Sequence, residues 1–371
     1  MSANALTLAS HAATKPNLLG LGGDELLEWV ESIGQRPYRA RQLMQWIHQR
    51  HVLDFDSMTD LSLALRTELK SVATLATPAV VKQEQSNDGT IKWLLDVGSG
   101  QAIEAVMIPE PKRATLCISS QAGCALDCAF CATGQEGFNR NLSAAEILGQ
   151  VAFACAAVSP IEISNVVFMG MGEPLANYRN VVAATRLLLD DRAYGLSRRR
   201  VTISTAGLVP QIKRLAEDCN VALAVSLHAP TNDLRDELVP INRRHPIAEL
   251  LEACWQYAEV IASRQITFEY VMLDGVNDSV KQAKTLIRLL RNRPAKVNLI
   301  PFNDFEGSRF RCSTQDAMDA FWQTLNAGGV LATFRRPRGD DIAAACGQLA
   351  GRVDDRRRVK LGDRLSGVTS T

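Results

Sequence analysis

The chain has 371 residues, of which 46% are hydrophobic, and its formal net charge is +1. This length allows one large domain and one small one, and this hydrophobic content can fill a sizeable core. The nine cysteines are an odd number, the first residues lack the charged start and apolar stretch of a signal peptide, and no apolar run approaches the roughly 18 residues of a membrane span. Composition thus argues against disulfide scaffolding, secretion and membrane insertion, and we expect a cytoplasmic protein that folds alone as a monomer.

The first segment predicts a small helical domain behind a leader. Residues 1–16 are rich in Ala, Ser and Thr without periodicity, which predicts a flexible leader. Over residues 17–75, apolar side chains recur at helical intervals, as in the stripe from Leu26 to Ile33. A second helix there would leave basic side chains on its outer face: Arg39, Arg41, His48, Arg50 and His51.

Residues 76–109 predict a short β linker. An Asn-Asp-Gly turn signal lies between two alternating runs, and a third run completes a meander. In the third run Glu104 falls on the same face as Val106 and Ile108. A carboxylate among aliphatic residues is either a strand-edge residue in water or a partly desolvated acid whose raised pKa suits it to act as a base.

Residues 110–351 alternate apolar strands with helical stretches, one of which opens with the capping box Ser143 to Glu146. The expected strands span residues 114–119, 163–169, 200–204, 221–227, 266–273, 296–302 and 331–336. This repetition predicts an α/β fold, a partial (β/α)6 barrel with right-handed crossovers and with ligand groups at the C-terminal ends of its strands. Residues 352–371 would form a basic tail.

Three cysteines stand close together in the run CALDCAFC: Cys124, Cys128 and Cys131. Thiolates at CxxxCxxC spacing suit a loop wrapped over a [4Fe–4S] cluster. Three protein ligands would leave one iron open to a small molecule with an amino group and a carboxylate, as in enzymes that cleave S-adenosylmethionine into a radical. The alternatives are buried thiols or a zinc site with a distant histidine, although structural zinc usually needs a second CxxC pair, which the sequence lacks.

Small and polar residues follow the expected strands. Gly170 and Gly172 would let the backbone approach a ligand, and Glu173 can accept hydrogen bonds from an ammonium group. The other strand-end residues are Ser204, Ser226, Leu227, His228 and Asn303. Singly, each is usually a structural hydrogen bonder, but at one rim they suit the carboxylate, ribose and adenine of a nucleoside cofactor.

Two further cysteines and several basic runs remain open to interpretation. Cys117 lies in a strand, and Cys346 lies in a short helix that an aspartate could cap and Gly347 end, so each reads as a packed thiol when taken alone. Any one basic run is more often a solvated face than a binding site, but four together suggest patches that could meet phosphates. They comprise Arg198–Arg200, Arg243 with Arg244, Arg335 with Arg336 and Arg338, and Arg356–Arg358 with Lys360.

Longer stretches around these residues resemble the RlmN family of dual-specificity RNA methyltransferases, within the radical S-adenosylmethionine (SAM) superfamily. The resemblance runs from about residue 17 to 350 and rests on runs that include CISSQAGCALDCAFCATG, VVFMGMGEPLAN, AVSLHAP and RGDDIAAACGQLAG. It implies methylation of carbon 2 of adenosine in 23S rRNA, at the peptidyl-transferase centre, and in tRNA, at the nucleotide following the anticodon.

The resemblance also implies a role for each candidate residue. Cys124, Cys128 and Cys131 would hold one [4Fe–4S] cluster. Cys346 would carry the methyl group, Cys117 would release the product through a transient disulfide with Cys346, and Glu104 would accept a proton. The residues matching the family's contacts to SAM, used twice per turnover, are Gly172, Glu173, Ser204, Ser226, Leu227, His228 and Asn303.

The same resemblance implies several partners. The helical domain and the basic patches would bind folded 23S rRNA and tRNA, with the target base flipped out. A flavodoxin-like, low-potential electron donor would supply electrons. Three alternatives are the related carbon-8 methyltransferases of antibiotic resistance, a radical activase of glycyl enzymes, and a non-enzymatic protein that binds zinc and RNA.

Overall fold

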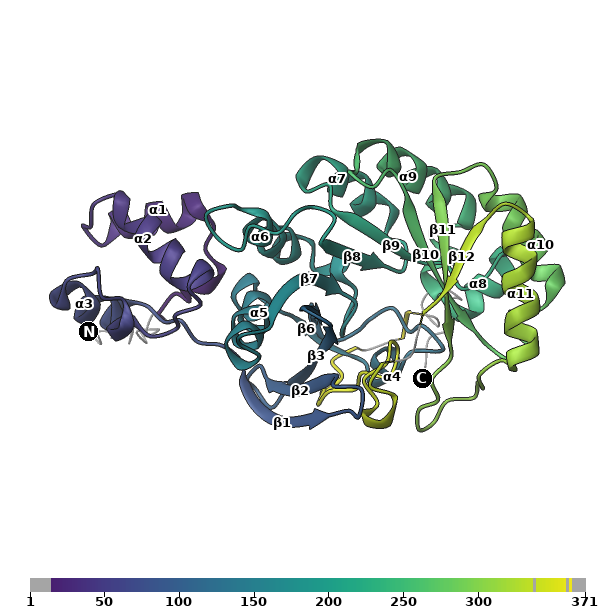
Figure 1. The fold of residues 1–371 in the computed structure, drawn as a ribbon, viewed down its shortest axis with the longest axis horizontal. Coiled ribbons are helices and arrows are strands. Elements are labelled where there is room, and N and C mark those ends of the chain that lie inside the picture. The colour runs from purple at the N-terminus through teal and green to yellow at the C-terminus, as the bar shows by residue number, and fades with distance from the viewer. Residues whose placement is uncertain (1–14, 336–337, 358–359, 362–371) are drawn as a thin grey trace, which may run out of the picture.

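The computed structural model describes residues 15–335, 338–357 and 360–361. Residues 17–75 form a helical lobe at one end of the molecule (Figure 1). Its elements are η1 (Leu18–Gly20), α1 (Gly23–Ser32), α2 (Tyr38–Met44), η2 (Gln45–Gln49), η3 (Phe55–Ser57) and α3 (Leu63–Val72). The apolar stripe predicted for α1 buries Leu26 and Val30 in a hydrophobic core that continues into the rest of the molecule. The predicted flexible leader falls almost entirely outside the described residues.

The helix after α2 differs from the regular helix that the sequence predicts. Residues Gln45–Gln49 form a turn of π-helix, which adds a residue to the turn and rotates the following side chains. His48, expected on the outer basic face, is instead fully buried, with its ring 5.1 Å from that of Tyr194. Burial lowers the pKa of His48 to about 4, so this side chain adds no charge to the lobe at neutral pH.

The meander predicted for residues 76–109 is present as β1 (Ala79–Gln85), β2 (Ile91–Asp96) and β3 (Ala102–Glu110). These strands pair antiparallel, and the expected turn is closed by a hydrogen bond from the Gly89 amide to the Ser86 carbonyl. β3 also pairs with the first barrel strand, β4 (Arg113–Cys117), so backbone hydrogen bonding runs across the predicted boundary at residue 109. The meander therefore extends the sheet of the barrel.

Within the described residues, ten strands form one sheet in the order β1-β2-β3-β4-β7-β8-β9-β10-β11-β12. In this order, the strands from β4 onward run parallel to one another. The strands after β4 are β7 (Glu162–Phe168), β8 (Val201–Thr205), β9 (Ala222–Ser226), β10 (Ile266–Met272), β11 (Ala295–Pro301) and β12 (Leu331–Phe334). Each prediction of a barrel strand is confirmed. β12 pairs only with β11 in this sheet, so the barrel is partial.

Helices connect the parallel strands and cover the outside of the barrel, with α10 and α11 at the end far from the helical lobe (Figure 1). They are α4 (Ala132–Glu136), α5 (Ala144–Ala157), α6 (Tyr178–Leu189), α7 (Val209–Asp218), α8 (Asn232–Leu238), α9 (Ile247–Val260), α10 (Val280–Leu290) and α11 (Gln315–Ala327). The capping box predicted at the start of α5 is present, because Ser143 and Glu146 hydrogen-bond each other reciprocally. Among the described helices none is long and apolar enough to cross a membrane.

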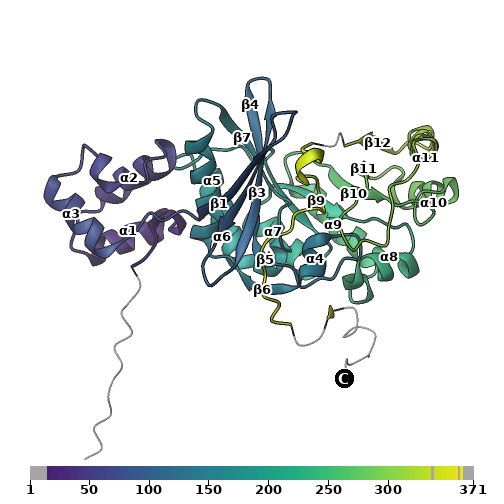
Figure 2. The ribbon, with the colours of Figure 1, turned by 90° about the horizontal axis from the view of Figure 1, so that it is seen from below.

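The C-terminal segment returns to the meander and runs beside α4 in both views (Figure 1 and Figure 2). The prediction that a short helix ends at Gly347 is wrong in its extent. The helix η6 spans only Asp340–Ile342, and the chain then turns at Ala343, which has a positive φ of 49°. The Thr133 hydroxyl donates to the Leu349 carbonyl at 2.6 Å, which ties the segment to α4. This path brings Cys346 back to the barrel mouth.

Candidate active site

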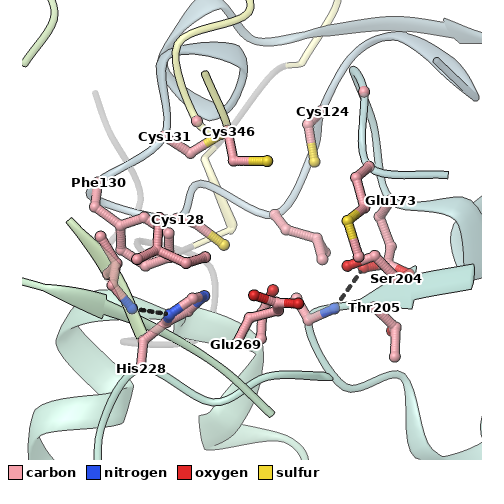
Figure 3. Close-up of a pocket in the computed structure, with 18 of the residues that line it drawn as sticks. Cys124, Cys128, Phe130, Cys131, Glu173, Ser204, Thr205, His228, Glu269 and Cys346 are labelled. Carbon is pink, nitrogen blue, oxygen red and sulfur yellow. Dashed lines mark hydrogen bonds between the residues drawn. The ribbon is translucent and has the colours of Figure 1, made fainter. Parts of the chain in front are cut away.

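A cavity of about 150 Å³ lies at the C-terminal ends of the barrel strands, between the cysteine loop and the strand ends (Figure 3). It brings together most of the predicted site residues: Cys124, Cys128, Cys131, Gly172, Glu173, Ser204, Ser226, His228 and Cys346. Figure 3 shows side chains of the cysteine loop facing Glu173, Ser204 and His228 across this space. These residues therefore lie together at the strand ends, where the strand-end rule expects ligand groups.

The cysteine loop lies between the two strands of an antiparallel ribbon, β5 (Gln121–Gly123) and β6 (Phe138–Asn141). Gly123 has a φ of 76°, and a side chain there would collide with the Gly137 carbonyl, so only glycine fits. The Cys124 amide donates to that carbonyl at 2.6 Å. These contacts fix the start of the loop and direct the cysteines into the cavity.

The three thiols suit an iron-sulfur cluster better than a single metal ion. Among the described residues, no three His, Cys, Asp or Glu side chains converge on one point where an ion could sit. Zinc requires its thiolates in one shell at about 2.3 Å, whereas each cysteine around a cubane binds a different iron. Burial raises the pKa of Cys124, Cys128 and Cys131, so the free thiols keep their protons until iron displaces them.

Glu173 lies on the wall opposite the cysteine loop. It is buried, and its two carboxyl oxygens accept hydrogen bonds from the Leu175 amide at 2.9 Å and the Ala206 amide at 2.8 Å. Burial raises its pKa to about 7, although these hydrogen bonds act in the opposite direction. A carboxylate held this way can accept a further hydrogen bond from a cationic ligand in the cavity.

His228 follows β9 with a φ of 58°, a left-handed conformation that is strained for a histidine. Its Nδ1 accepts a hydrogen bond from the Val271 amide at 3.0 Å, so Nε2 carries the ring proton. Burial lowers the pKa of His228 to about 3, and the Phe130 ring packs against it at 4.4 Å between centroids. The imidazole is therefore a neutral donor that also supports the cysteine loop.

Two charged residues that line the cavity were not predicted as site residues. Glu269 lies inside β10 and accepts a hydrogen bond from Asn298 at 2.9 Å. The signal that singled out Glu104, a carboxylate within an apolar strand, also marks Glu269. Arg335 follows β12 and lines the cavity, so the prediction that it belongs to a surface patch for phosphates is wrong.

A smaller cavity of about 40 Å³ adjoins the first, and Cys117, Asn303 and Arg335 line it. Cys346 lines both cavities, so its side chain lies at the wall between the cluster loop and Cys117. Burial raises the pKa of Cys117 to about 12 and also raises the pKa of Cys346, while Arg335 opposes both shifts. All nine cysteines are free thiols in the structure.

Besides Cys117, three predicted site residues lie outside the first cavity. Asn303 faces Cys117 instead, and Leu227 is fully buried with its carbonyl bonded to Arg235 at 3.1 Å. Glu104 lines neither cavity, because its carboxylate accepts a hydrogen bond from the Ala350 amide at 3.0 Å. Burial raises the pKa of Glu104, with Lys92 opposing the shift, so of the two readings left open by the sequence the desolvated acid is the one observed.

Part of the predicted basic tail has a structural role. The Arg357 side chain is largely buried and forms ion pairs with Asp127 and Asp355. Asp127 belongs to the cysteine loop, so this arginine holds the C-terminal segment against the loop. Arg336, Arg358 and residues 362–371 lie outside the described residues.

Comparison with known proteins agrees with this geometry. A family model for the ribosomal RNA large subunit methyltransferase N-terminal domain matches residues 16–75, and the radical SAM superfamily model matches residues 118–287. The crystal structure of a radical SAM methyltransferase from Sphaerobacter thermophilus is 45% identical, with a TM-score of 0.86, over 90% of this chain and 99% of that chain. A domain of the pyruvate-formate lyase-activating enzyme from Bacteroides vulgatus is 19% identical over 47% of this chain and 99% of that chain; its TM-score of 0.37 is too low to inform function.

A partial parallel barrel with a three-cysteine loop at its strand ends defines a radical SAM enzyme, a class that works with a [4Fe–4S] cluster and SAM. Together with the N-terminal match and the close structural relative, it places the chain among the radical SAM methyltransferases of the RlmN type. The predictions of fold class and of a SAM-dependent enzyme are thereby confirmed. A glycyl-enzyme activase and a non-catalytic zinc protein are excluded as descriptions of this chain.

Proposed function

We propose that this enzyme methylates carbon 2 of adenosine in 23S rRNA and in tRNA through a methyl group carried on Cys346. The observation that carries the proposal is the position of Cys346 on the wall shared by two cavities. On one side are the thiols that suit a cluster, and on the other is Cys117. A carrier thiol needs access to both.

The residues of the first cavity would hold the cofactors. Cys124, Cys128 and Cys131 would bind the cluster, and Glu173 would accept hydrogen bonds from the amino group of SAM. When bound, the cluster and SAM supply the radical that activates a methyl group at a carbon with no nucleophilic lone pair. His228, as a neutral donor, would recognise the nucleoside part of SAM, of which two molecules would be used per turnover.

Glu104, which lines neither cavity, and Cys117 of the second cavity would complete the transfer. Once Cys346 is joined to carbon 2 through its methylene group, the Glu104 carboxylate would take the proton from carbon 2. After one electron has been given up and this proton removed, the Cys117 thiolate would attack the sulfur of Cys346, forming the S–S bond as the carbon–sulfur bond breaks. The methylene carbon would leave with the bonding electron pair and take up a proton, which makes it the methyl group on carbon 2. The two sulfurs lie beside one cavity as free thiols, so the disulfide would be transient.

The RNA part of the proposal is supported by exposed arginines near the barrel mouth. Arg243 and Arg244 are exposed. They lie after α8, in the connection that leaves the C-terminal end of β9, which is the end that carries the cavity. Arg338 lines the second cavity. Arg198 and Arg199 are exposed too, but they precede β8 and so lie at the opposite ends of the strands. A flavodoxin-like protein would supply the electrons.

The decisive experiment is mass spectrometry of 23S rRNA and tRNA from cells that lack the gene, and from the same cells supplied with the wild-type protein or with Cys346→Ala. We expect 2-methyladenosine only with the wild-type protein. Appearance of 8-methyladenosine would instead assign the carbon-8 reaction, and unchanged RNA in all three strains would overturn the proposal.

A further inference from the structure

Lys92 is a buried lysine in the meander that the proposed reaction does not yet use. Its side chain is only 8% exposed, and its ammonium group lies 3.1 Å from a Glu104 oxygen and 3.6 Å from a Glu84 oxygen. The same ammonium donates a hydrogen bond to the Ala343 carbonyl at 3.2 Å. A lysine is rarely buried unless it is paired, so these contacts define its role.

The Lys92–Glu104 pair holds the chain on both sides of Cys346. Lys92 binds the Ala343 carbonyl, which precedes the cysteine, and Glu104 accepts from the Ala350 amide, which follows it, at 3.0 Å. The two contacts therefore span the segment from Ala343 to Ala350 like a clamp.

The strength of this clamp depends on the charge of Glu104. Hydrogen bonds and ion pairs to an ionised carboxylate are roughly twice as strong as those to a neutral carboxyl group. Burial raises the pKa of Glu104, Lys92 lowers it, and the neighbouring charge of Glu84 raises it again. Glu136 faces the same group, and its own carboxylate accepts from the Gly351 amide at 3.0 Å.

On the basis of the proposed function, we propose that Lys92 is a positioning residue that couples proton uptake by Glu104 to release of the Cys346 segment. While Glu104 is ionised, the clamp holds Cys346 at the wall between the cavities. When the proton leaves carbon 2 and joins the Glu104 carboxylate, the ion pair to Lys92 is lost and the Ala350 contact weakens. Lys92 keeps its own proton throughout, so no other bond changes in this step.

The consequence is an ordered reaction. Cys346 would move toward Cys117 only after carbon 2 has lost its proton, so the disulfide would not form before the RNA is ready for release. The movement would be local, because contacts beyond the clamp do not involve Glu104. Asp341 still binds the Asn87 amide at 3.1 Å before the segment, and Glu136 still accepts from the Gly351 amide at 3.0 Å after it.

Hydrogen–deuterium exchange of the full-length protein tests the clamp without any catalysis. At neutral pH we expect amide exchange in peptides covering residues 343–350 to become at least tenfold faster in Lys92→Met and Glu104→Gln, and to stay near wild type in Lys92→Arg. Lys82→Met is the matched control, since Lys82 lies on the same sheet and pairs with Glu84 at 2.9 Å but not with Glu104. Unchanged exchange in both Lys92→Met and Glu104→Gln would overturn the clamp.

A second measurement separates this inference from the proposed function. Mild oxidation of the RNA-free protein, followed by mass spectrometry, should yield the Cys117–Cys346 disulfide several-fold faster in Glu104→Gln and Lys92→Met than in wild type or Lys82→Met. Equal rates would refute the gating even if the clamp exists. Absence of a methyl group on Cys346 of the wild-type protein would refute the carrier role instead, whatever the exchange rates of the Lys92 variants.

Discussion

The two sides of the barrel mouth are built in different ways. The cluster side comes from one short loop, in which Cys124, Cys128 and Cys131 follow one another within eight residues of chain. The Cys346 side is assembled from the meander, from β4 and from the C-terminal segment, which meet only in the folded protein. The first side is thus a local motif, whereas the second is a tertiary arrangement.

The two sides also differ in charge. Facing the cluster loop, burial raises the pKa of Glu173 to about 7 and lowers the pKa of His228 to about 3, so near neutral pH Glu173 is partly protonated and His228 is neutral. Behind Cys346, Lys92 and Glu104 form a buried ion pair. Cluster binding would thus depend on donor atoms at a short spacing, while the proposed control of Cys346 would depend on charges brought together by folding.

The largest expected effect is on the cluster side. Cys128→Ala should abolish the brown absorbance of the reconstituted protein and all cleavage of SAM, because three thiolates are the only cluster ligands that the motif supplies. Cys155→Ala, which removes a half-buried thiol from α5 away from both cavities, is the control and should retain both properties. Normal SAM cleavage by Cys128→Ala would show that Cys128 is not a cluster ligand, and the local motif would then no longer account for the cluster side.

The next prediction concerns the thiols of the other side. Cys346→Ala should yield neither methylated protein nor methylated RNA, because the carrier acts before RNA attack. Cys117→Ala should instead leave RNA covalently joined to Cys346, as seen by denaturing gel electrophoresis and mass spectrometry. If Cys117→Ala turns over freely with no adduct, another group resolves the intermediate.

A smaller effect is expected for the proton acceptor. Glu104→Gln should slow RNA methylation by about 10²–10⁴-fold, the usual contribution of a general base, while SAM cleavage persists. Only the ionised carboxylate can accept a proton, and burial raises the pKa of Glu104 above its ordinary value of 4.5. Activity of the wild-type protein should therefore fall as the pH drops through this raised pKa. Lys92→Met, which removes the opposing charge, should move that fall to higher pH, and a profile identical to wild type would contradict this account.

The smallest effect is expected at the outer arginines. Each phosphate neutralised contributes a slope of roughly 0.7 to 0.9 in the dependence of log affinity on log salt. Replacing Arg243 and Arg244 by Ala should reduce this slope by about 1 to 2, as measured in RNA-binding titrations. Replacing Arg198 and Arg199, which lie at the other ends of the strands, should have less effect, and equal effects would extend the RNA contact over both ends of the barrel.

Much of this molecule follows from local patterns in the sequence. Alternation of apolar strands and helices suffices for the parallel barrel, since each βα unit obeys short-range rules of period and handedness. The cysteine loop, Glu173 and His228 follow because the C-terminal ends of parallel strands meet at one rim. For Glu104 the sequence left open a strand-edge residue in water or a desolvated acid, and burial in the folded sheet decided for the acid.

Only the tertiary structure decided the rest. His48 is buried because a π-turn rotates it against Tyr194, a residue distant in sequence. In the sequence, Lys92 has the pattern of an ordinary strand residue and Arg335 that of a surface residue. Folding brings Lys92 beside Glu104 and Arg335 into the cavity that Cys346 lines. Local periodicity reports which face of an element is buried, but electrostatic partners come from segments whose proximity depends on the whole sheet. The sequence by itself therefore determined which residues gather at the barrel mouth, and the folded chain decided which charges lie beside them.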